Sequence, residues 1–312
     1  MIRFRSQRAT LRAGLLAGAL ASWGCAKAVP AGAQDVASAD TAALMKTVRI
    51  LAADSMEGRR AGTPGGARAR RYLLERLAAL GVAPIAGSYE HSFPLTRDSG
   101  RGVNLLGTLP GTRPGEPFIV LSAHYDHVGI RRGEIYNGAD DNASGVAALL
   151  AIAESLKKAP LGHPVIIALF DAEEGGLSGA RAFVANPPVA RERIAMNLNL
   201  DMVGHSESGE LWVAGANHRP QFRAMLDSVA ATAPVVLKVG HDRRGVPEEQ
   251  DWTGSSDHGP FHAAGIPFLY FGVEDHKDYH KSTDDPETLT PEFFGKAVAT
   301  VEAVLRRVDR ML

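Results

Sequence analysis

Cysteine is almost absent from this chain of 312 residues. The single cysteine, Cys25, lies near the N-terminus, so the rest of the protein has no disulfide and must be stabilised by packing or by a bound metal. A charge excess is lacking too: the formal net charge is −1, so we expect no nucleic-acid partner. Beyond the N-terminal segment no run of about 20 apolar residues occurs, and no membrane-spanning segment is expected.

The first 33 residues have the layout of a secretory signal peptide. A basic start with four arginines leads into a short apolar run, and Ala31-Gly-Ala33 supplies small residues before a cleavage point at Gln34. We therefore expect residues 1–33 to direct export to the periplasm or the medium, and residues 34–312 to form one domain. Lipid anchoring through Cys25 is the less favoured alternative, because leucine is missing from its usual place in a lipoprotein processing site.

Strand-like and helix-like patterns alternate after residue 40. Short apolar runs predict strands, and apolar residues at helical spacing predict helices. This alternation predicts an α/β fold, a three-layer sandwich in which a mostly parallel mixed sheet carries helices on both faces. Strands are expected over 118–123, 165–170, 197–200, 211–213 and 267–271, and helices over 44–51, 73–80, 146–153, 222–229 and from about 291 to the end.

Acidic residues and histidines directly follow three of the predicted strands. The first of these strands ends in His124-Tyr-Asp126, the second is followed by Glu173-Glu174, and the third ends at Asp201. The carboxyl ends of strands in an open α/β sheet meet in one crevice, so these side chains are expected to lie close together. Buried charges are costly unless they are neutralised. The pattern therefore predicts a site for one or two divalent metal ions.

The segment between the first two of these strands contains an aspartate doublet that opens a predicted helix. Asp141 or Asn142 is best interpreted as the N-cap of that helix, because these residue types satisfy free backbone N–H groups there. Asp140 precedes the cap and is the better candidate for the crevice. The Glu173-Glu174 doublet could be a solvated turn, but its place after an apolar run favours the crevice as well.

Five motifs, in this order along the chain, resemble the two-zinc aminopeptidase family of bacterial leucyl aminopeptidases. That family is related to glutamate carboxypeptidases, glutaminyl cyclases and the non-catalytic transferrin receptor. The resemblance also includes Glu57-Gly-Arg-Arg-Ala-Gly-Thr-Pro64 and Ser256-Asp-His258, so it covers nearly all of residues 34–312. The five motifs are His124-x-Asp126, Gly138-Ala-Asp140-Asp141-Asn-Ala-Ser-Gly145, Ala172-Glu173-Glu174-Gly-Gly-Leu177, Asp201 and Tyr279-His280-Lys-Ser-Thr-Asp284.

This resemblance implies a zinc metallopeptidase domain with two Zn²⁺ ions per chain. Carried over residue by residue, it implies that His124 and Asp201 bind one zinc ion and that Glu174 and His280 bind the other. Asp140 would bridge the two ions, and the peptide bond between Asp140 and the next residue would be cis.

The resemblance also implies the catalytic residues. Glu173 would act as the general base, and Asp126 would accept a hydrogen bond from the His124 ring and fix its orientation. Tyr279 would donate a hydrogen bond to the oxyanion, unless it is only a packing aromatic beside a ligand.

The sequence thus predicts an exported zinc-dependent exopeptidase that acts on peptides, with an aminopeptidase as the favoured activity. A carboxypeptidase or a glutaminyl-peptide cyclotransferase on the same fold is the alternative. A non-catalytic binding module with a degenerate site is disfavoured, because none of the implied ligands is missing.

Overall fold

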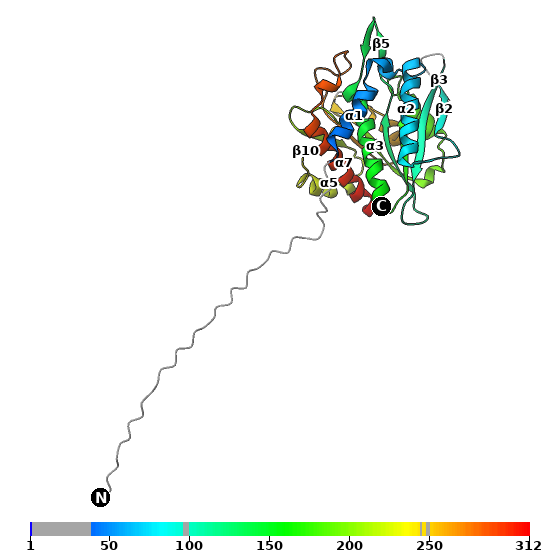
Figure 1. Cartoon of the computed structure of the whole chain (residues 1–312). Helices are drawn as coiled ribbons and strands as arrows, with labels where there is room; N and C mark the ends of the chain where they lie inside the picture. Colours follow the sequence, from blue (N-terminus) through cyan, green and yellow to red (C-terminus); the bar gives the residue numbers. More distant parts are fainter. Residues whose placement is uncertain (2–38, 96–99, 244, 248–249) are drawn as a thin grey trace. The chain divides into compact units, whose positions relative to one another are not determined.

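The computed structural model describes residues 1, 39–95, 100–243, 245–247 and 250–312 (Figure 1). Apart from Met1, the expected signal peptide of residues 1–33 lies outside the described residues, as does the alternative lipid attachment at Cys25. The described residues from 39 onward belong to one structural unit. Within them, no helix is both long and apolar enough to cross a bilayer.

A nine-stranded mixed sheet lies at the centre of this unit. The neighbouring strands β7 (Val165–Phe170), β4 (Phe118–His124), β8 (Ile194–Leu200) and β11 (Phe268–Gly272) are parallel to one another. So are β9 (Glu210–Ala214) and β10 (Val236–Val239), and the other pairings are antiparallel. The predicted mixed α/β sheet is therefore confirmed. In spatial order the strands are β1 (Ala83–Pro84), β3 (Arg101–Leu109), β7 (Val165–Phe170), β4 (Phe118–His124), β8 (Ile194–Leu200), β11 (Phe268–Gly272), β9 (Glu210–Ala214) and β10 (Val236–Val239), with β2 (Glu90–Pro94) paired to β3.

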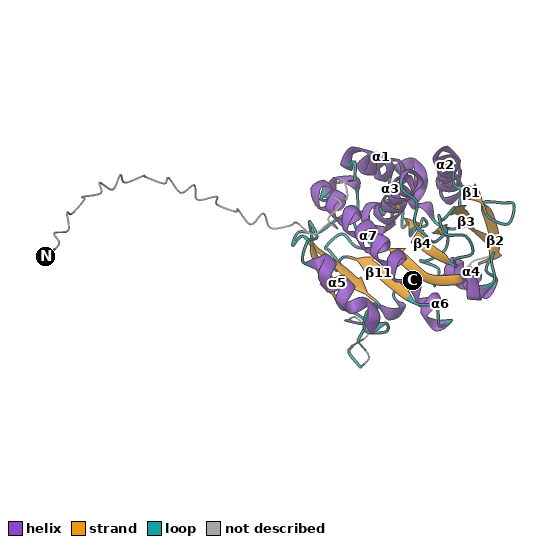
Figure 2. Ribbon diagram, turned by 90° about the horizontal axis from the view of Figure 1, so that it is seen from below, coloured by secondary structure: helices purple, strands orange, loops and turns teal. Residues whose placement is uncertain are grey.

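Helices cover both faces of the sheet (Figure 2). Each face has its own cluster of buried apolar side chains, and β4 contributes to both: Ile119 and Leu121 point to one face and Val120 to the other. The predicted three-layer sandwich is thus confirmed. The first face carries α1 (Thr41–Leu51), α2 (Pro64–Leu80), α3 (Gly145–Lys158), α5 (Arg223–Ala230) and α7 (Pro291–Met311), and the second carries α4 (Ser178–Ala185) and α6 (His258–Ala263).

Local sequence explains where the first two helices begin and end. The Asp40 carboxylate accepts hydrogen bonds from two free backbone N–H groups at the start of α1. The Thr63 hydroxyl accepts one such bond, from the Gly66 N–H at the start of α2, and Pro64 occupies the first turn, where its missing N–H costs nothing. Gly81 ends α2 in the left-handed conformation at φ 68°.

Short elements connect these layers. They are the hairpin β5 (Gly129–Arg131) and β6 (Glu134–Tyr136), the π-helical turn η2 (Ala139–Ser144), and the 3₁₀ turns η1 (Asp54–Arg59), η3 (Arg191–Arg193), η4 (Pro220–Phe222), η6 (Trp252–Gly254) and η7 (Pro286–Thr288).

The register of the parallel strands brings the predicted site residues to one edge of the sheet. In this register His124 pairs with Phe170 of β7, and Ser122 pairs with Asn199 of β8. Two residues further along both strands, His124 is therefore level with Asp201. The acidic turn after β7 follows at the same edge, so the residues that the sequence predicts to meet do share one edge of the sheet.

Candidate metal centre

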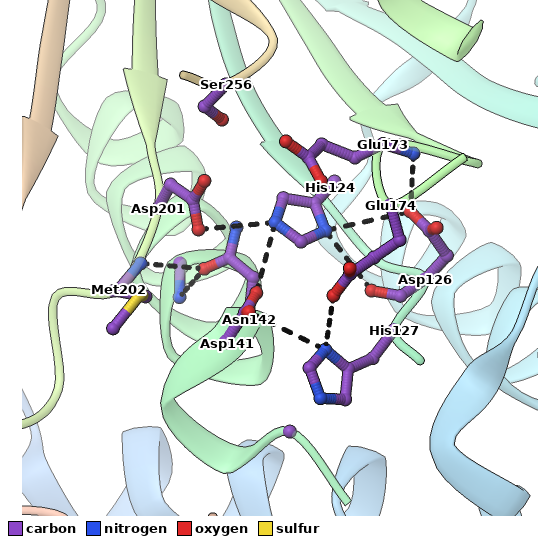
Figure 3. A network of polar contacts seen from close by, with 12 residues as sticks. His124, Asp126, His127, Asp141, Asn142, Glu173, Glu174, Asp201, Met202 and Ser256 are labelled. Atoms are coloured by element: carbon purple, nitrogen blue, oxygen red, sulfur yellow. Dashed lines mark hydrogen bonds and ion pairs between the residues drawn. The ribbon is translucent and has the colours of Figure 1, made fainter. Parts of the chain in front are cut away.

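Two clusters of potential metal ligands meet at the carboxyl end of the sheet. His124, Asp141 and Asp201 form the first, and His127, Asp141 and Glu174 form the second. In each cluster the ligand atoms lie close enough together to hold one metal ion. Asp141 belongs to both, so its carboxylate lies between two candidate metal positions (Figure 3).

The first cluster is buried and carries two carboxylates around one imidazole. The His124 Nε2 atom lies 3.2 Å from Asp201 Oδ1 and 3.4 Å from Asp141 Oδ1. Burial alone would lower the pKa of His124, but the carboxylates of Asp201 and Glu173 raise this pKa well above its ordinary value. The imidazole is therefore held in a strongly negative field, which a divalent cation would neutralise.

His280 lies beside the second cluster. Its Nε2 atom lies 3.1 Å from Asp141 Oδ2 and 3.4 Å from Glu174 Oε2, while His127 Nδ1 lies 2.7 Å from Glu174 Oε1. Desolvation would lower the pKa of His280, yet the Asp141 and Glu174 carboxylates raise it to about 10. Desolvation raises the pKa of Glu174, as does the charge of Asp141, but the two histidines outweigh them and lower it to about 2. Each of the two carboxylates is thus attracted to a neighbouring imidazole.

The prediction that Asp140 bridges the two metal positions is wrong by one residue. The Asp140 carboxylate points elsewhere: Oδ1 accepts a hydrogen bond from the Gly204 backbone N–H at 2.7 Å, and Oδ2 lies 3.1 Å from His276 Nε2. Asp141 is the aspartate that the two ligand clusters share. The reason is the path of η2, in which the backbone N–H groups of Asp140 and Asp141 both donate to the Asp284 carboxylate, at 2.9 and 3.0 Å.

The next residue shows the same shift of one position. The cis peptide bond joins Asp141 to Asn142. The resemblance implied a cis bond one residue earlier, between Asp140 and Asp141, and that prediction is wrong. Asn142 Oδ1 accepts the N–H of Gly145, the first residue of α3, at 2.9 Å. Asn142 therefore satisfies a free backbone N–H at the start of α3 as the cap interpretation expected and Asp141 does not, although Ser144 is the residue that directly precedes the helix. Gly138 makes this turn possible, because a Cβ there would lie 2.2 Å from the Asp141 carbonyl oxygen.

The Asp126 carboxylate lies beside both His124, a potential metal ligand, and Glu173, the candidate general base. Asp126 Oδ1 accepts the backbone N–H of Glu173 at 3.0 Å and lies 3.6 Å from His124 Nδ1. The backbone carbonyl of Asp126 is closer to the same ring nitrogen, at 3.1 Å. Burial raises the pKa of Glu173 well above its ordinary value, although His124 opposes the shift. A carboxyl group with this property is suited to take up and release a proton.

Tyr279 lies beside the second cluster and packs on one of its ligands. Its ring stacks on His280, with centroids 4.0 Å apart and an interplanar angle of 23°. Burial raises the pKa of Tyr279, so its hydroxyl stays protonated and able to donate a hydrogen bond. The geometry accommodates both interpretations that the sequence left open.

Comparison with known proteins places this arrangement in a family. A sequence model of peptidase family M28 matches residues 104–305. The chain belongs to peptidase family M28. Aminopeptidase YwaD of Bacillus subtilis is 32% identical over 212 residues, which cover 65% of this chain and 44% of that protein. Leupeptin-inactivating enzyme 1 of Streptomyces exfoliatus is 29% identical over 246 residues, 77% of this chain and 50% of that protein. This M28 chain thus spans about half the length of these relatives.

Solved structures share the fold of this M28 chain. A leucine aminopeptidase precursor from Bacteroides thetaiotaomicron has a TM-score of 0.70 at 20% identity, covering 87% of this chain and 98% of the other. A glutaminyl cyclase from the same organism has a TM-score of 0.69 at 20% identity, with 87% and 99% coverage. Because one fold serves proteins named for two reactions, the fold alone does not select an activity.

The donor set of this M28 site fits zinc. Zinc prefers imidazole nitrogen, carboxylate oxygen and thiolate sulfur, and the first two converge here. Three carboxylates, those of Asp141, Glu174 and Asp201, face the histidines in a largely buried place. Unneutralised carboxylates in such a place are unfavourable, so cations are needed to offset them.

A residue whose role the sequence did not reveal, Arg59, holds the segments that carry the ligands. Its guanidinium is fully buried and donates hydrogen bonds to four backbone carbonyls: Tyr125 at 2.9 Å, Leu51 at 2.8 Å, Asn137 at 2.5 Å and Gly138 at 2.8 Å. These contacts join the end of β4 to the segment that enters η2. Burial lowers the pKa of Arg59 to about 10, so it stays charged at neutral pH. The resemblance at residues 57–64 was the only signal for this residue.

Proposed function

We propose that this M28 chain is an exported aminopeptidase that holds two zinc ions and hydrolyses N-terminal peptide bonds. The observation that supports it most strongly is the pair of ligand clusters that share Asp141, beside the buried carboxyl group of Glu173. The names of the curated relatives support the choice of an aminopeptidase. Zinc ions bound there would lower the pKa of a water molecule and polarise the scissile carbonyl group.

The residues of the chain have distinct tasks in this proposal. His124 and Asp201 would hold one ion, Glu174 and His280 would hold the other, and Asp141 would serve both. Zinc with three protein ligands can also bind and activate a water molecule.

Proton transfer is the task of Glu173. It accepts a proton from the attacking water and passes it to the leaving amine. Asp126 positions Glu173 by accepting a hydrogen bond from its backbone N–H, and Asp126 also lies beside the His124 ring. Asp126 therefore holds the general base Glu173 in a fixed position relative to the metal ligand His124. Tyr279 donates a hydrogen bond to the oxygen that becomes negative in the tetrahedral intermediate.

Export is supported by the layout of residues 1–33. Expression of the full chain in a bacterial host, followed by fractionation and mass spectrometry of the exported protein, tests it. A mature N-terminus at Gln34 is the expected result. A lipid-modified N-terminus at Cys25 would instead support membrane anchoring.

The activity is tested with three panels of substrates: carboxyl-blocked dipeptides with a free amine, amine-blocked dipeptides with a free carboxylate, and peptides that begin with glutamine. The proposal predicts hydrolysis of the first panel alone among the blocked dipeptides. Cleavage of the amine-blocked panel would identify a carboxypeptidase. Loss of ammonia from the glutamine peptides, without hydrolysis, would identify a cyclase.

The role of Glu173 is tested by Glu173→Gln, which keeps the shape of the side chain but removes the base. Turnover should fall by about 10²-fold or more while both zinc ions remain, because Glu173 is not one of the proposed ligands. Glu154→Gln is the matched control, since Glu154 is exposed on α3 and pairs with Lys158. A near-normal rate in Glu173→Gln would contradict the assignment.

A further inference from the structure

His127 lies against Glu174 at ion-pair distance, but the two side chains do not have the geometry of a good hydrogen bond. The His127 side chain is fully buried, directly after Asp126, and neither ring nitrogen has a hydrogen-bond partner among the described residues. Glu174 Oε1 is likewise buried without such a partner. Yet His127 Nδ1 and Glu174 Oε1 are only 2.7 Å apart. The two atoms are thus close but not aligned as donor and acceptor, as expected for two ligands that face the same cation.

The surroundings of these two atoms define that cation position. Asp141 Oδ2 lies 3.7 Å from His127 Nδ1 and 3.1 Å from His280 Nε2, and His280 Nε2 lies 3.4 Å from Glu174 Oε2. The His127 and His280 rings are 5.9 Å apart and tilted by 53°, so they do not stack on each other. Four donor side chains, two imidazoles and two carboxylates, therefore lie next to one another, and each imidazole faces both carboxylates.

We propose that His127 binds the second divalent ion directly through Nδ1. The position formed by His127, Asp141, Glu174 and His280 then has four protein ligands, whereas the position formed by His124, Asp141 and Asp201 has three. This inference rests on the proposed two-metal function and adds a difference between the two ions. Four-ligand zinc positions are closed and structural, and three-ligand positions leave room for water or substrate.

The difference assigns separate roles to the two positions. The ion at the four-ligand position is held more tightly and anchors the crevice. An ion at the three-ligand position would keep one coordination place free for water or substrate, and Figure 3 shows the Glu173 carboxylate beside His124 and away from His127. The general base therefore lies next to the open position. A chelator should remove the ion at the open position first.

X-ray absorption at the zinc edge tests this inference, because it counts the imidazole groups bound to zinc. Fully loaded wild-type protein should show three imidazoles per two zinc ions. After a chelator has removed the weaker ion, the remaining zinc should show two. His127→Ala should reduce the count by one in the fully loaded state. His163→Asn is the control, because His163 is an equally buried histidine that pairs with Asp309, at 2.8 Å, away from the two clusters.

Two results would overturn the inference. One is two zinc ions with one imidazole each, unchanged in His127→Ala, which would reduce His127 to a neighbour of Glu174. The other is a single imidazole on the ion that resists the chelator. If His127→Ala does not fold, the wild-type counts alone decide. A protein that takes up no zinc, or one ion at most, would instead refute the proposed two-metal function, and the inference with it.

Discussion

Asp140 and Asp141 are adjacent and chemically identical, yet their carboxylates have different partners. Asp141 faces both ligand clusters, whereas Asp140 accepts a backbone hydrogen bond from Gly204 and lies beside His276. The sequence predicted that this doublet serves the site, but it selected Asp140, whereas Asp141 faces the two clusters. That choice depends on the backbone path through η2, where a change of one residue reverses the direction of the side chain.

Substitution of each aspartate by asparagine tests this assignment. Asp141→Asn removes the charge that faces both metal positions, so metal content should fall below one ion per chain, and activity should fall with it. Asp140→Asn should retain both ions, because Asp140 contacts neither cluster. Elemental analysis of the dialysed variants measures the difference. Loss of metal from Asp140→Asn, with retention in Asp141→Asn, would restore the original prediction.

Metal uptake should depend on pH because the ligands hold protons when no metal is bound. The pKa of His280 is raised to about 10, and the pKa of His124 is also raised well above its ordinary value. Below these pKa values zinc must displace a proton from each imidazole, so affinity should fall as pH falls, by about tenfold per pH unit for each proton released. Calorimetry in buffers of different ionisation enthalpy measures the release. An affinity that stays constant between pH 6 and pH 8 would contradict this account.

His127 shows why a local pattern missed a site residue. It follows Asp126 by one position. Because His124 already supplied the histidine of the His124-x-Asp126 motif, nothing in the sequence pattern pointed to His127 as a further ligand. Only the return of the chain through the turn after β7, which brings Glu174 to 2.7 Å from it, reveals its position.

At the scale of elements, the segment η1 acts through Arg59. Its guanidinium donates to carbonyls on three segments and keeps the end of β4 close to the approach to η2. Because the group is fully buried, loss of its hydrogen bonds leaves several backbone acceptors without partners.

Arg59→Met should therefore lower the free energy of unfolding by about 3 kcal/mol or more, at roughly 1–3 kcal/mol for each buried acceptor left unpaired. Arg59→Lys should recover only part of this, because an ammonium lacks the planar fork that reaches several carbonyls at once. Urea unfolding measures both. Arg68→Met is the control: Arg68 pairs with Glu57 at a partly exposed place, and its loss should cost less than about 1 kcal/mol. Equal effects of the Arg59 and Arg68 substitutions would refute the proposal that Arg59 stabilises the segments whose carbonyls it contacts.

The apolar patterns identified most of the elements that carry the site. The helices expected at 44–51, 73–80 and 146–153 and the strands expected at 118–123 and 165–170 are confirmed, because their spacing reflects burial on one or both faces. β3 was missed, since glycines interrupt its apolar run. Gly107 is required there, because a Cβ would lie 2.5 Å from Val82 Cγ1. Packing between elements, which no local pattern records, selects glycine at this position.

For the whole molecule, the register of the central parallel strands explains how distant motifs form one site. β4 and β8 end level with each other, so His124 and Asp201 meet although 77 residues separate them. Helices on both faces then bury the sheet and leave only its carboxyl edge for the ligands. The sequence predicted that His124, Glu174 and Asp201 come together, because all three follow parallel strands of the sheet, whatever the order of those strands.

The central claim is that two divalent ions flank the carboxylate of Asp141. A crystal structure of the zinc-loaded protein, with anomalous difference maps recorded on both sides of the zinc edge, tests it most directly. The account predicts two anomalous peaks on opposite sides of the Asp141 carboxylate, one beside His124 and Asp201 and the other beside Glu174 and His280. A single peak, or two peaks that leave Asp141 without a metal contact, would contradict it.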